Sequence, residues 1–401
     1  MPAPRVDASA AARRSGGRRD RFEARYLLWD ESTLPRLRKC GRVAVDDGGV
    51  AVRATGTGAE RVAGFSGVST CSSVWACPVC AAKVAAHRRL EIDAALGAWH
   101  AREGRVGLLT LTMRHHKHHR LADLWDALGK AWQRVTGGRQ WKADQLAHGT
   151  ELPRLVKTGA RAGQTVLEHR VPVIRAVEVT HGRNGWHVHI HALLFLRAGI
   201  SEEDAAALGD RAFARWHDSL IGSGLPAPTW KHGLDCRRLN GDPSAALGEY
   251  FTKVQYSAAS EVASSGTKTG RAGNRTPFQL LAGVVAGEAD DLDLWHEWEA
   301  GSHGRRQITW SSGLRVMLGL VVELTDQEIV EADALRGDVV ARVPLPTWRV
   351  LARDRRTHVL LELAEVDDDG TELRRFLDLV ADDWVAPPEK AGGRRRLRIA
   401  A

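Results

Sequence analysis

Apolar positions along the chain recur with two different periods, and their alternation predicts an α+β protein. A period near 3.6 residues predicts helices, whereas a period of two residues or a short apolar run predicts strands. The predicted elements are, in order, a helix at 81–99, a strand from 106, a helix at 121–135, strands at 173–180 and 185–196, a helix at 202–220, a strand near 234 and a helix at 243–257. This order fits a mainly antiparallel sheet with helices on one side.

The chain also divides by composition. The predicted divisions are a disordered basic arm at 1–34, a cysteine-rich module at 35–100, a main domain at 101–320 and a C-terminal region at 321–401. The arm is rich in arginine and lacks the apolar core of a secretory signal. In the C-terminal region, two apolar runs at 357–363 and 373–380 resemble strands. No apolar run reaches the roughly 18 residues of a membrane span, so we expect a cytoplasmic protein.

Three histidines share one face of the predicted strand at 185–196. His187, His189 and His191 occupy every second position, so their side chains project to the same side, and Val188 and Ile190 point the other way. Neighbouring imidazoles on one strand face are close enough to converge on a metal ion. The alternative is a strand with a polar, solvent-facing side.

A carboxylate can join these histidines. The preceding strand at 173–180 is separated from the histidine strand by turn residues, and a hairpin would bring Glu178 near the imidazoles. Two histidines and a carboxylate suit Mg²⁺ or Mn²⁺ when phosphate and water complete the shell, although non-haem iron accepts the same ligands. A solvated carboxylate is the alternative interpretation of Glu178.

The predicted helix at 243–257 carries two of the three tyrosines of the chain. Tyr250 and Lys253 are three residues apart and share a helix face. A phenol has an ordinary pKa near 10, so a nearby lysine and a metal-polarised phosphate would both help it act as a nucleophile. Tyr256 faces another direction and remains a second candidate, and a tyrosine that only packs on the sheet is the alternative to both.

Four cysteines in the first quarter of the chain predict a zinc site. The candidate ligands are Cys40, Cys71, Cys77 and Cys80, of which the last two form a C-x₂-C knuckle. His87 competes for the fourth position, and buried free thiols are the alternative. Cys236 stands alone and is expected in a strand core. The helix after the knuckle carries Arg88 and Arg89, which could contact DNA phosphates.

The charge balance agrees with a nucleic-acid partner. Lysine and arginine number 57 against 49 acidic residues, a net charge of +8 that attracts phosphates. Trp186, next to the histidines, is a candidate for contact with an unpaired base. The histidine-rich run at 115–119 is interpreted as a solvated turn outside the site.

Five segments together resemble the HUH endonucleases, and specifically the rolling-circle plasmid replication initiators of actinobacteria. They are an apolar strand with threonines at 108–112, the His-hydrophobe-His motif at 189–194 with the extra His187, the tyrosine motif at 250–253, and blocks at 276–281 and 304–311. The resemblance covers roughly 35–320. It implies a ferredoxin-like core with the histidines on a central strand of an antiparallel sheet.

The resemblance also implies a reaction. Such proteins bind the double-strand origin of plasmid DNA and expose a single-stranded segment, and a tyrosine then nicks it. A 5′-phosphotyrosine and a 3′-OH primer result, and the displaced strand is later rejoined. The chain has no phosphate-cradling P-loop motif, so helicase as well as polymerase would come from the host. Glu249 adjoins the tyrosine but points aside on a helix, so no residue is assigned to termination.

Two other classes of function fit part of this pattern. An HUH transposase or conjugative relaxase would share the histidines, but relaxases usually carry the nucleophile ahead of them, whereas Tyr250 follows. A non-catalytic, zinc-bearing DNA-binding regulator would make the histidine strand structural, and its tyrosine could be replaced by phenylalanine without effect.

Overall fold

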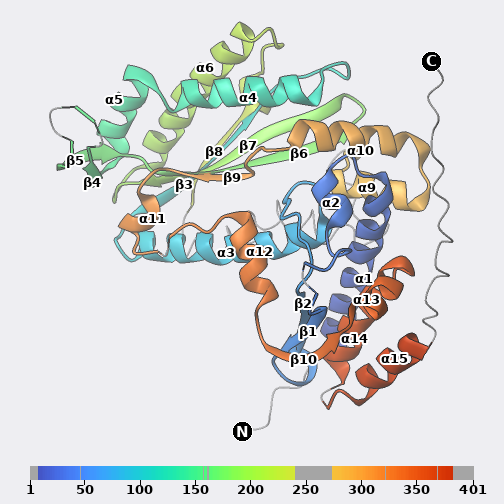
Figure 1. Ribbon diagram of the computed structural model, residues 1–401. Coiled ribbons are helices and arrows are strands. Elements are labelled where there is room, and N and C mark those ends of the chain that lie inside the picture. Colours follow the sequence, from blue (N-terminus) through green and yellow to red (C-terminus); the bar gives the residue numbers. More distant parts are fainter. Residues whose placement is uncertain are drawn as a thin grey trace, which may run out of the picture. The chain divides into compact units, whose positions relative to one another are not determined.

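The computed structural model describes residues 8–45, 47–156, 158–159, 162–239, 273–320, 322–367 and 369–382 (Figure 1). They form two compact units, each of which is described by itself. The larger unit holds residues 8–40 and 70–333, and the smaller holds 41–69 and the described residues from 334 onwards. The expected divisions at 35–100 and 321–401 therefore differ from the observed ones, because 41–69 joins the C-terminal part of the chain.

A five-stranded antiparallel sheet forms the centre of the larger unit. Its strands, in spatial order, are β8 (Leu234–Leu239), β3 (Arg105–Thr112), β7 (Gly185–Leu196), β6 (Val173–Gly182) and β9 (Ile308–Trp310). The histidine strand β7 is the middle one, as expected. It forms a tight hairpin with β6, in which Glu178 pairs with His189. Gly185 has a φ of +83° at the turn, a backbone conformation that favours glycine.

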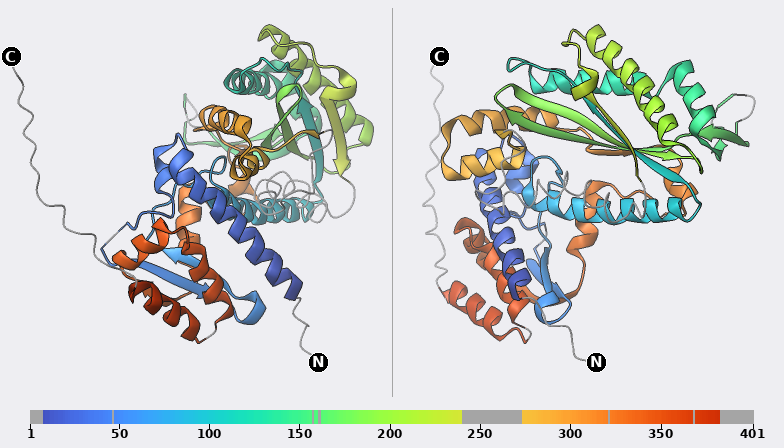
Figure 2. Two further views of the ribbon diagram at one scale, coloured as in Figure 1. Left: turned by 90° about the vertical axis from the view of Figure 1, so that its right-hand side faces the viewer. Right: turned by 180° about the vertical axis from the view of Figure 1, so that it is seen from behind.

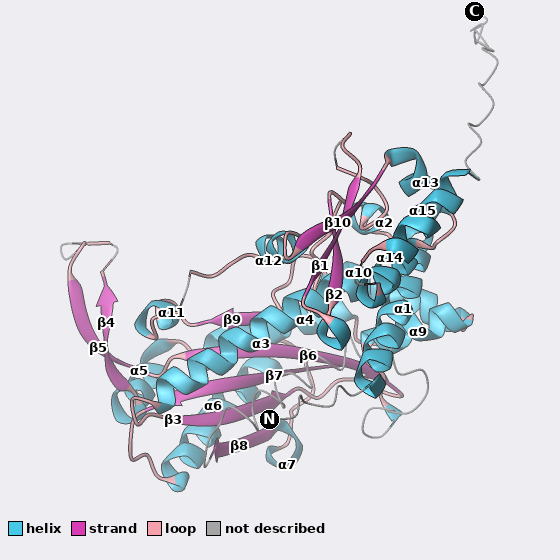
Figure 3. Cartoon of the chain, turned by 90° about the horizontal axis from the view of Figure 1, so that it is seen from below, coloured by secondary structure: helices cyan, strands magenta, loops and turns pink. Residues whose placement is uncertain are grey.

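Helices cover both faces of this sheet, so the expectation of helices on one side is wrong (Figure 2). One face packs against α4 (Leu121–Val135) and α6 (Glu202–Gly222). The other packs against α3 (Pro78–His100) and α11 (Leu314–Met317), and Figure 3 shows α3 lying across the strands. The physical reason is the end of β7: Leu193 and Phe195 point to one face and Leu194 and Leu196 to the other, and all four are buried.

The larger unit contains elements that the sequence did not predict. Helix α1 (Ala8–Glu31) occupies most of the expected disordered arm, so that prediction is wrong for these residues. The second half of α1 buries Phe22, Tyr26, Leu28 and Trp29, and the Trp29 indole donates a hydrogen bond to the carbonyl of Cys40 at 2.8 Å. The segment between α4 and β6, in which no helix or strand was predicted, forms α5 (Gly138–His148) and a hairpin of β4 (Thr150–Leu155) and β5 (Thr165–Arg170).

The remaining elements of the larger unit are helical. They are α2 (Pro35–Lys39), α7 (Trp230–Gly233), α9 (Pro277–Ala286), α10 (Ala289–Ser302) and α12 (Asp326–Ala334), of which the final residue lies in the smaller unit. Helix α9 begins with a complete capping box between Thr276 and Gln279. In the described part of the chain, no helix is both long and apolar enough to cross a bilayer.

The smaller unit joins two distant parts of the sequence. Strands β1 (Val50–Thr55) and β2 (Val62–Ser66), with a 3-10 turn (Gly58–Glu60) between them, pair with β10 (Asp338–Val343) in the order β10-β1-β2. Three helices follow: α13 (Leu345–Arg353), α14 (Thr357–Val366) and α15 (Thr371–Asp382). The runs at 357–363 and 373–380, expected as strands, are thus helical, because a short apolar run does not distinguish the two states.

Candidate functional site

The hairpin of β6 and β7 brings a carboxylate and two imidazoles together. Glu178 Oε2 lies 3.1 Å from His189 Nε2 and 3.0 Å from His191 Nε2. The ligand atoms of the three residues all lie within 4.8 Å of one another. Adjacent ligands of an octahedral ion with bonds of about 2.1 Å are about 3.0 Å apart, so this donor set fits a small divalent cation.

A threonine on the neighbouring strand orients the more buried imidazole. Thr110 of β3 pairs with His191, and its Oγ1 lies 2.9 Å from His191 Nδ1. When Nδ1–H donates to this hydroxyl, the lone pair of Nε2 is free for a metal. Thr110 belongs to the apolar strand at 108–112, whose threonines resembled a motif of the family.

The electrostatics of the cluster favour a bound cation. Burial raises the pKa of Glu178, but the charge and hydrogen bonds of His189 and the hydrogen bond of His191 outweigh it, so this pKa lies well below its usual range. Burial lowers the pKa of His191, and the hydrogen bond with Glu178 opposes this effect only in part. An ionised carboxylate and a neutral imidazole are the protonation states that bind metal ions.

His187 lies on the same strand face but has a different partner. Its Nδ1 is 3.0 Å from Nε2 of His115, whose own Nδ1 is 2.9 Å from the carbonyl oxygen of Asn184. A carbonyl only accepts, so Nδ1 of His115 carries a hydrogen. When the His115 ring is neutral, its Nε2 accepts the hydrogen that His187 carries on Nδ1. The Nε2 of a neutral His187 then carries no hydrogen and can accept a hydrogen bond. Burial lowers the pKa of His187 to about 4, so this side chain is neutral at pH 7.

The sequence interpretation therefore missed His115. It lies in the run at 115–119 that was interpreted as a solvated turn. The signal is three-dimensional: a Cβ added to Gly185 would meet the backbone of Lys117 at 2.9 Å, so this loop rests on the hairpin turn of β6 and β7. Sequence spacing alone does not show a contact between a loop and a turn that are roughly 70 residues apart.

Two of the three predicted DNA-contacting residues are buried. Trp186 is 2% exposed and stacks on Trp298, with ring centroids 5.8 Å apart. It lies on the sheet face opposite His187, as strand alternation requires. Arg88 is 8% exposed and bonds Glu91, Asp326 and the Leu324 carbonyl. Neither presents a surface to DNA.

Arg89 differs from its neighbour. Its side chain is 43% exposed, and it pairs with Asp93 of the same helix at 3.5 Å. Of the three residues predicted to contact DNA, only Arg89 is therefore placed so that it could do so.

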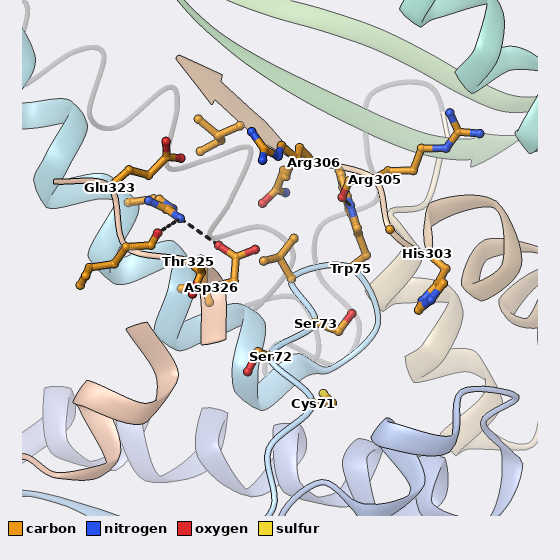
Figure 4. Close-up of a pocket in the computed structure, with 17 residues that line it drawn as sticks. Cys71, Ser72, Ser73, Trp75, His303, Arg305, Arg306, Glu323, Thr325 and Asp326 are labelled. Carbon is orange, nitrogen blue, oxygen red and sulfur yellow. Dashed lines mark hydrogen bonds and ion pairs between the residues drawn. The ribbon is translucent and has the colours of Figure 1, made fainter. Parts of the chain in front are cut away.

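The pocket that Arg88 helps to line is shown in Figure 4 and has a volume of about 470 Å³. A loop with Cys71, Ser72 and Ser73 forms one side, and the segment of Arg305 and Arg306 forms another. The pocket therefore adjoins both the cysteine loop and the sequence block at 304–311.

The four predicted zinc ligands converge in the larger unit. Cys40 follows α2, Cys71 lies in a loop, Cys77 caps α3 and Cys80 lies in its first turn. Three of the Sγ–Sγ distances are 3.6–3.8 Å, and all four thiols are buried. A tetrahedral zinc ion with Zn–S bonds of about 2.3 Å places sulfur atoms about 3.8 Å apart, so the cluster fits zinc. His87 instead lies 3.4 Å from Glu91 and is not part of it.

Cys236 is a separate, structural thiol. It lies on β8, and its Sγ is 3.3 Å from the carbonyl oxygen of Ala205 in α6. Burial raises its pKa to about 11, so it is an unreactive thiol at neutral pH.

The later sequence blocks border the histidine hairpin, whereas the tyrosine motif lies outside the described residues. His181 and Arg275 form a β-bridge ahead of the block at 276–281, and β9 in the block at 304–311 pairs with β6. Tyr250, Lys253 and the alternative Tyr256 all belong to the stretch at 240–272 that is not described.

Comparison with known proteins gives two relatives. Protein rep of Streptomyces lividans is 34% identical over 383 residues, which are 86% of this chain and 77% of that protein. A neomycin resistance protein of Streptomyces cyanogenus is 29% identical over 265 residues, which are 60% of this chain and 57% of that protein. No protein-family model and no solved structure matches. Because the first likeness extends over most of both chains, this chain belongs to the family of Protein rep.

Proposed function

We propose that this chain is a plasmid replication initiator of the rolling-circle type, with an HUH endonuclease core. The observation that carries the proposal is the cluster of Glu178, His189 and His191 on the central hairpin of an antiparallel sheet. A relative that is named Protein rep supports replication as the process. We infer a ferredoxin-like arrangement for the sheet and the helices that cover it.

In this proposal the two histidines and Glu178 hold Mg²⁺ or Mn²⁺, which withdraws charge from the scissile phosphate when bound. Thr110 keeps the His191 ring in the orientation that directs Nε2 to the cluster. His187 and His115 form a neutral imidazole pair beside it. The hydrogen bond that His187 donates to His115 fixes the ring of His187, so the Nε2 of this ring offers an acceptor at one edge of the site.

Tyr250 is the proposed nucleophile, and Lys253 is proposed to favour its ionised form. The bond that forms joins the phenol oxygen to phosphorus, and the bond that breaks joins phosphorus to the 3′ oxygen, which takes up a proton. The phosphotyrosine conserves the energy of the phosphodiester, so a later 3′-OH can reverse the step without ATP. Host helicase and polymerase would extend the primer.

The smaller unit offers a candidate surface for duplex DNA. Helices α13 and α14 are joined by three residues, 354–356, an arrangement found in helix-turn-helix motifs. Arg349 and Arg355 are exposed on this helix pair. We propose that this unit contributes to origin binding, and that the four-cysteine cluster binds zinc in a structural role.

A nicking assay tests the proposal. Supercoiled plasmid with the cognate origin is incubated with Mg²⁺ or Mn²⁺ and with wild type, Tyr250→Phe or His189→Ala. We expect wild type to relax the plasmid and remain on the 5′ end, and both variants to fail. Tyr256→Phe is the matched control for the tyrosine, and His118→Ala, which changes an exposed histidine, is the control for the metal ligand.

The outcomes separate the alternatives. If Tyr250→Phe still cuts and Tyr256→Phe does not, the nucleophile is Tyr256. If wild type binds the origin without a nick or adduct under either metal, the chain is a binding protein. Cleavage of a single-stranded oligonucleotide without dependence on a plasmid origin would favour a transposase or relaxase.

A further inference from the structure

A second pocket lies on the opposite face of the sheet from the histidines. Its volume is about 270 Å³, and its lining residues belong to α4, α5, the end of β5, β6 and β9 or lie directly after these elements. These elements are labelled in Figures 1 and 3. The side chains that matter here are Trp132, Trp141, Arg170, Arg175, Thr309 and Ser311. The volume is near the lower end for small-ligand sites, which suits one compact ligand.

Arg175 is the unusual residue of this pocket. Its side chain is partly exposed, but its Nε is buried and has no hydrogen-bond partner among the described residues. Burial lowers its pKa to about 10, so it is still charged at pH 7. Two other shielded arginines of this unit contact a carboxylate: Arg215 lies 2.7 Å from Asp144 and Arg315 lies 2.7 Å from Glu91. A partly buried cation without an anion is less stable than a paired one, and a ligand anion would supply the missing partner.

The surroundings of Arg175 indicate which anion. Its guanidinium lies 5.9 Å from the ring of Trp132, which is partly exposed. Thr309 is its cross-strand partner on β9, so the hydroxyl lies on the same sheet face. Arg170 lines the same pocket and uses one nitrogen for the Ser312 carbonyl at 3.1 Å. Guanidinium groups recognise phosphate, and an indole face stacks on a base.

We propose that this pocket binds one nucleotide unit, with its phosphate at Arg175 and its base against Trp132. The nucleotide is either part of a DNA strand or a free nucleotide, since both offer the same phosphate and base. The site goes beyond the proposed cleavage function and does not depend on it, because Glu178, His189 and His191 lie on the other face of the sheet. Failure of the nicking assay would leave this site untouched.

The test uses the full-length chain in buffer without added Mg²⁺ or Mn²⁺, so that neither ion bridges a phosphate to the histidine cluster. Thymidine 5′-monophosphate and inorganic phosphate are titrated by calorimetry. A fluorescein-labelled oligothymidine of about 12 nucleotides is titrated by anisotropy. Arg175→Met and Trp132→Leu are compared with Arg134→Met, a matched control that removes an exposed guanidinium from α4.

We expect Arg175→Met to weaken binding of at least one nucleotide probe about tenfold or more, because charge-assisted hydrogen bonds to phosphate are removed. Trp132→Leu is expected to weaken binding of the nucleotide probes but not binding of inorganic phosphate. Loss confined to oligothymidine identifies a DNA strand as the occupant, and loss confined to the monophosphate identifies a free nucleotide. Arg134→Met should change each affinity by less than about twofold.

Stability distinguishes a ligand site from a structural arginine. Removal of an unpaired buried charge should leave the thermal midpoint of Arg175→Met unchanged or raise it. A lowered thermal midpoint of Arg175→Met counts against the proposal. The nucleotide affinity of Trp132→Leu then decides whether the pocket is a ligand site. The proposal is overturned if wild type binds neither nucleotide probe, or if Trp132→Leu binds both as wild type does.

Discussion

Arg88→Met should reduce stability and leave DNA binding unchanged. Arg88 makes three hydrogen bonds: to Glu91 at 3.0 Å, to Asp326 at 3.0 Å and to the Leu324 carbonyl at 2.7 Å. Methionine keeps the apolar stem and removes all three. A hydrogen bond to a charged group contributes about 1.5–3 kcal/mol, and an unpaired buried carboxylate would add more.

The neighbours limit this loss. Glu91 keeps two hydrogen bonds from Arg315, at 2.7 and 2.9 Å, and the side chain of Asp326 is 41% exposed, so water can replace its partner. We therefore expect the free energy of unfolding to fall by about 2–3 kcal/mol. For a unit of this size the thermal midpoint should drop by roughly 5–10 °C.

Differential scanning fluorimetry and urea titration measure this change, and oligonucleotide anisotropy measures the affinity. Arg89→Met is the matched control: its side chain is 43% exposed and its ion pair lies within one helix turn, so loss of this pair should cost less than about 0.5 kcal/mol. If Arg88→Met kept the wild-type midpoint and bound DNA several-fold more weakly, the guanidinium would be a DNA contact and the structural reasoning would be refuted.

The contact between Arg88 and Glu91 also predicts how the stability of the protein depends on pH. Burial raises the pKa of Glu91, but hydrogen bonds from Arg315 and Arg88 and their charges outweigh it, so the folded-state pKa is lowered. A lowered carboxyl pKa contributes stability that is present above the unfolded value, near 4.3, and lost as the pH falls through the folded value. The difference between wild type and Arg88→Met should be full at pH 7 and narrow below about pH 4.

Three further predictions concern the metal sites and the smaller unit. Glu178→Gln should weaken Mn²⁺ binding by about tenfold or more, and Thr110→Val by about tenfold through the orientation of its histidine; equal calorimetric affinity in either variant would contradict the assigned contact. Cys77→Ser should lower the zinc content measured by mass spectrometry and the thermal midpoint together, because binding free energy is folding free energy; zinc-free wild type of unchanged midpoint would remove the structural role. Replacing Arg349 and Arg355 by glutamine should reduce the salt slope of duplex binding by about one for each phosphate that the protein no longer neutralises, and an unchanged slope would exclude this helix pair from the DNA surface.

The sequence predicted the histidine hairpin because its information is local. A period of two residues defines both strands, and the turn residues between them fix the register that opposes Glu178 to His189. The four cysteines were equally visible, since residue type and knuckle spacing indicate zinc directly. Strand alternation already placed Trp186 on the face opposite His187, so its burial was predictable from the same pattern.

The errors come from contacts between distant segments. His115 reaches His187 through a loop that rests on the hairpin turn, and no periodicity records that contact. Helix α1 was hidden by its arginine-rich first half, although Phe22 and Trp29 lie buried in its second half. In the smaller unit, Val50 of β1 pairs with Val343 of β10. Because these strands are far apart in the sequence, no local pattern of residues predicts this unit.

The cysteine cluster also has a place in the connectivity of the chain. The segment at 41–69, which supplies β1 and β2 to the smaller unit, departs directly after Cys40 and returns just before Cys71. A zinc ion held by both cysteines would close a loop of roughly 30 residues, which lowers the conformational entropy of the unfolded state by an amount worth about 3.6 kcal/mol. During synthesis this loop can close long before β10 emerges from the ribosome, so the metal would keep the β1–β2 pair tethered until β10 arrives to pair with β1. A truncation that ends before residue 338 leaves β1 with an open edge, and we expect such fragments to aggregate.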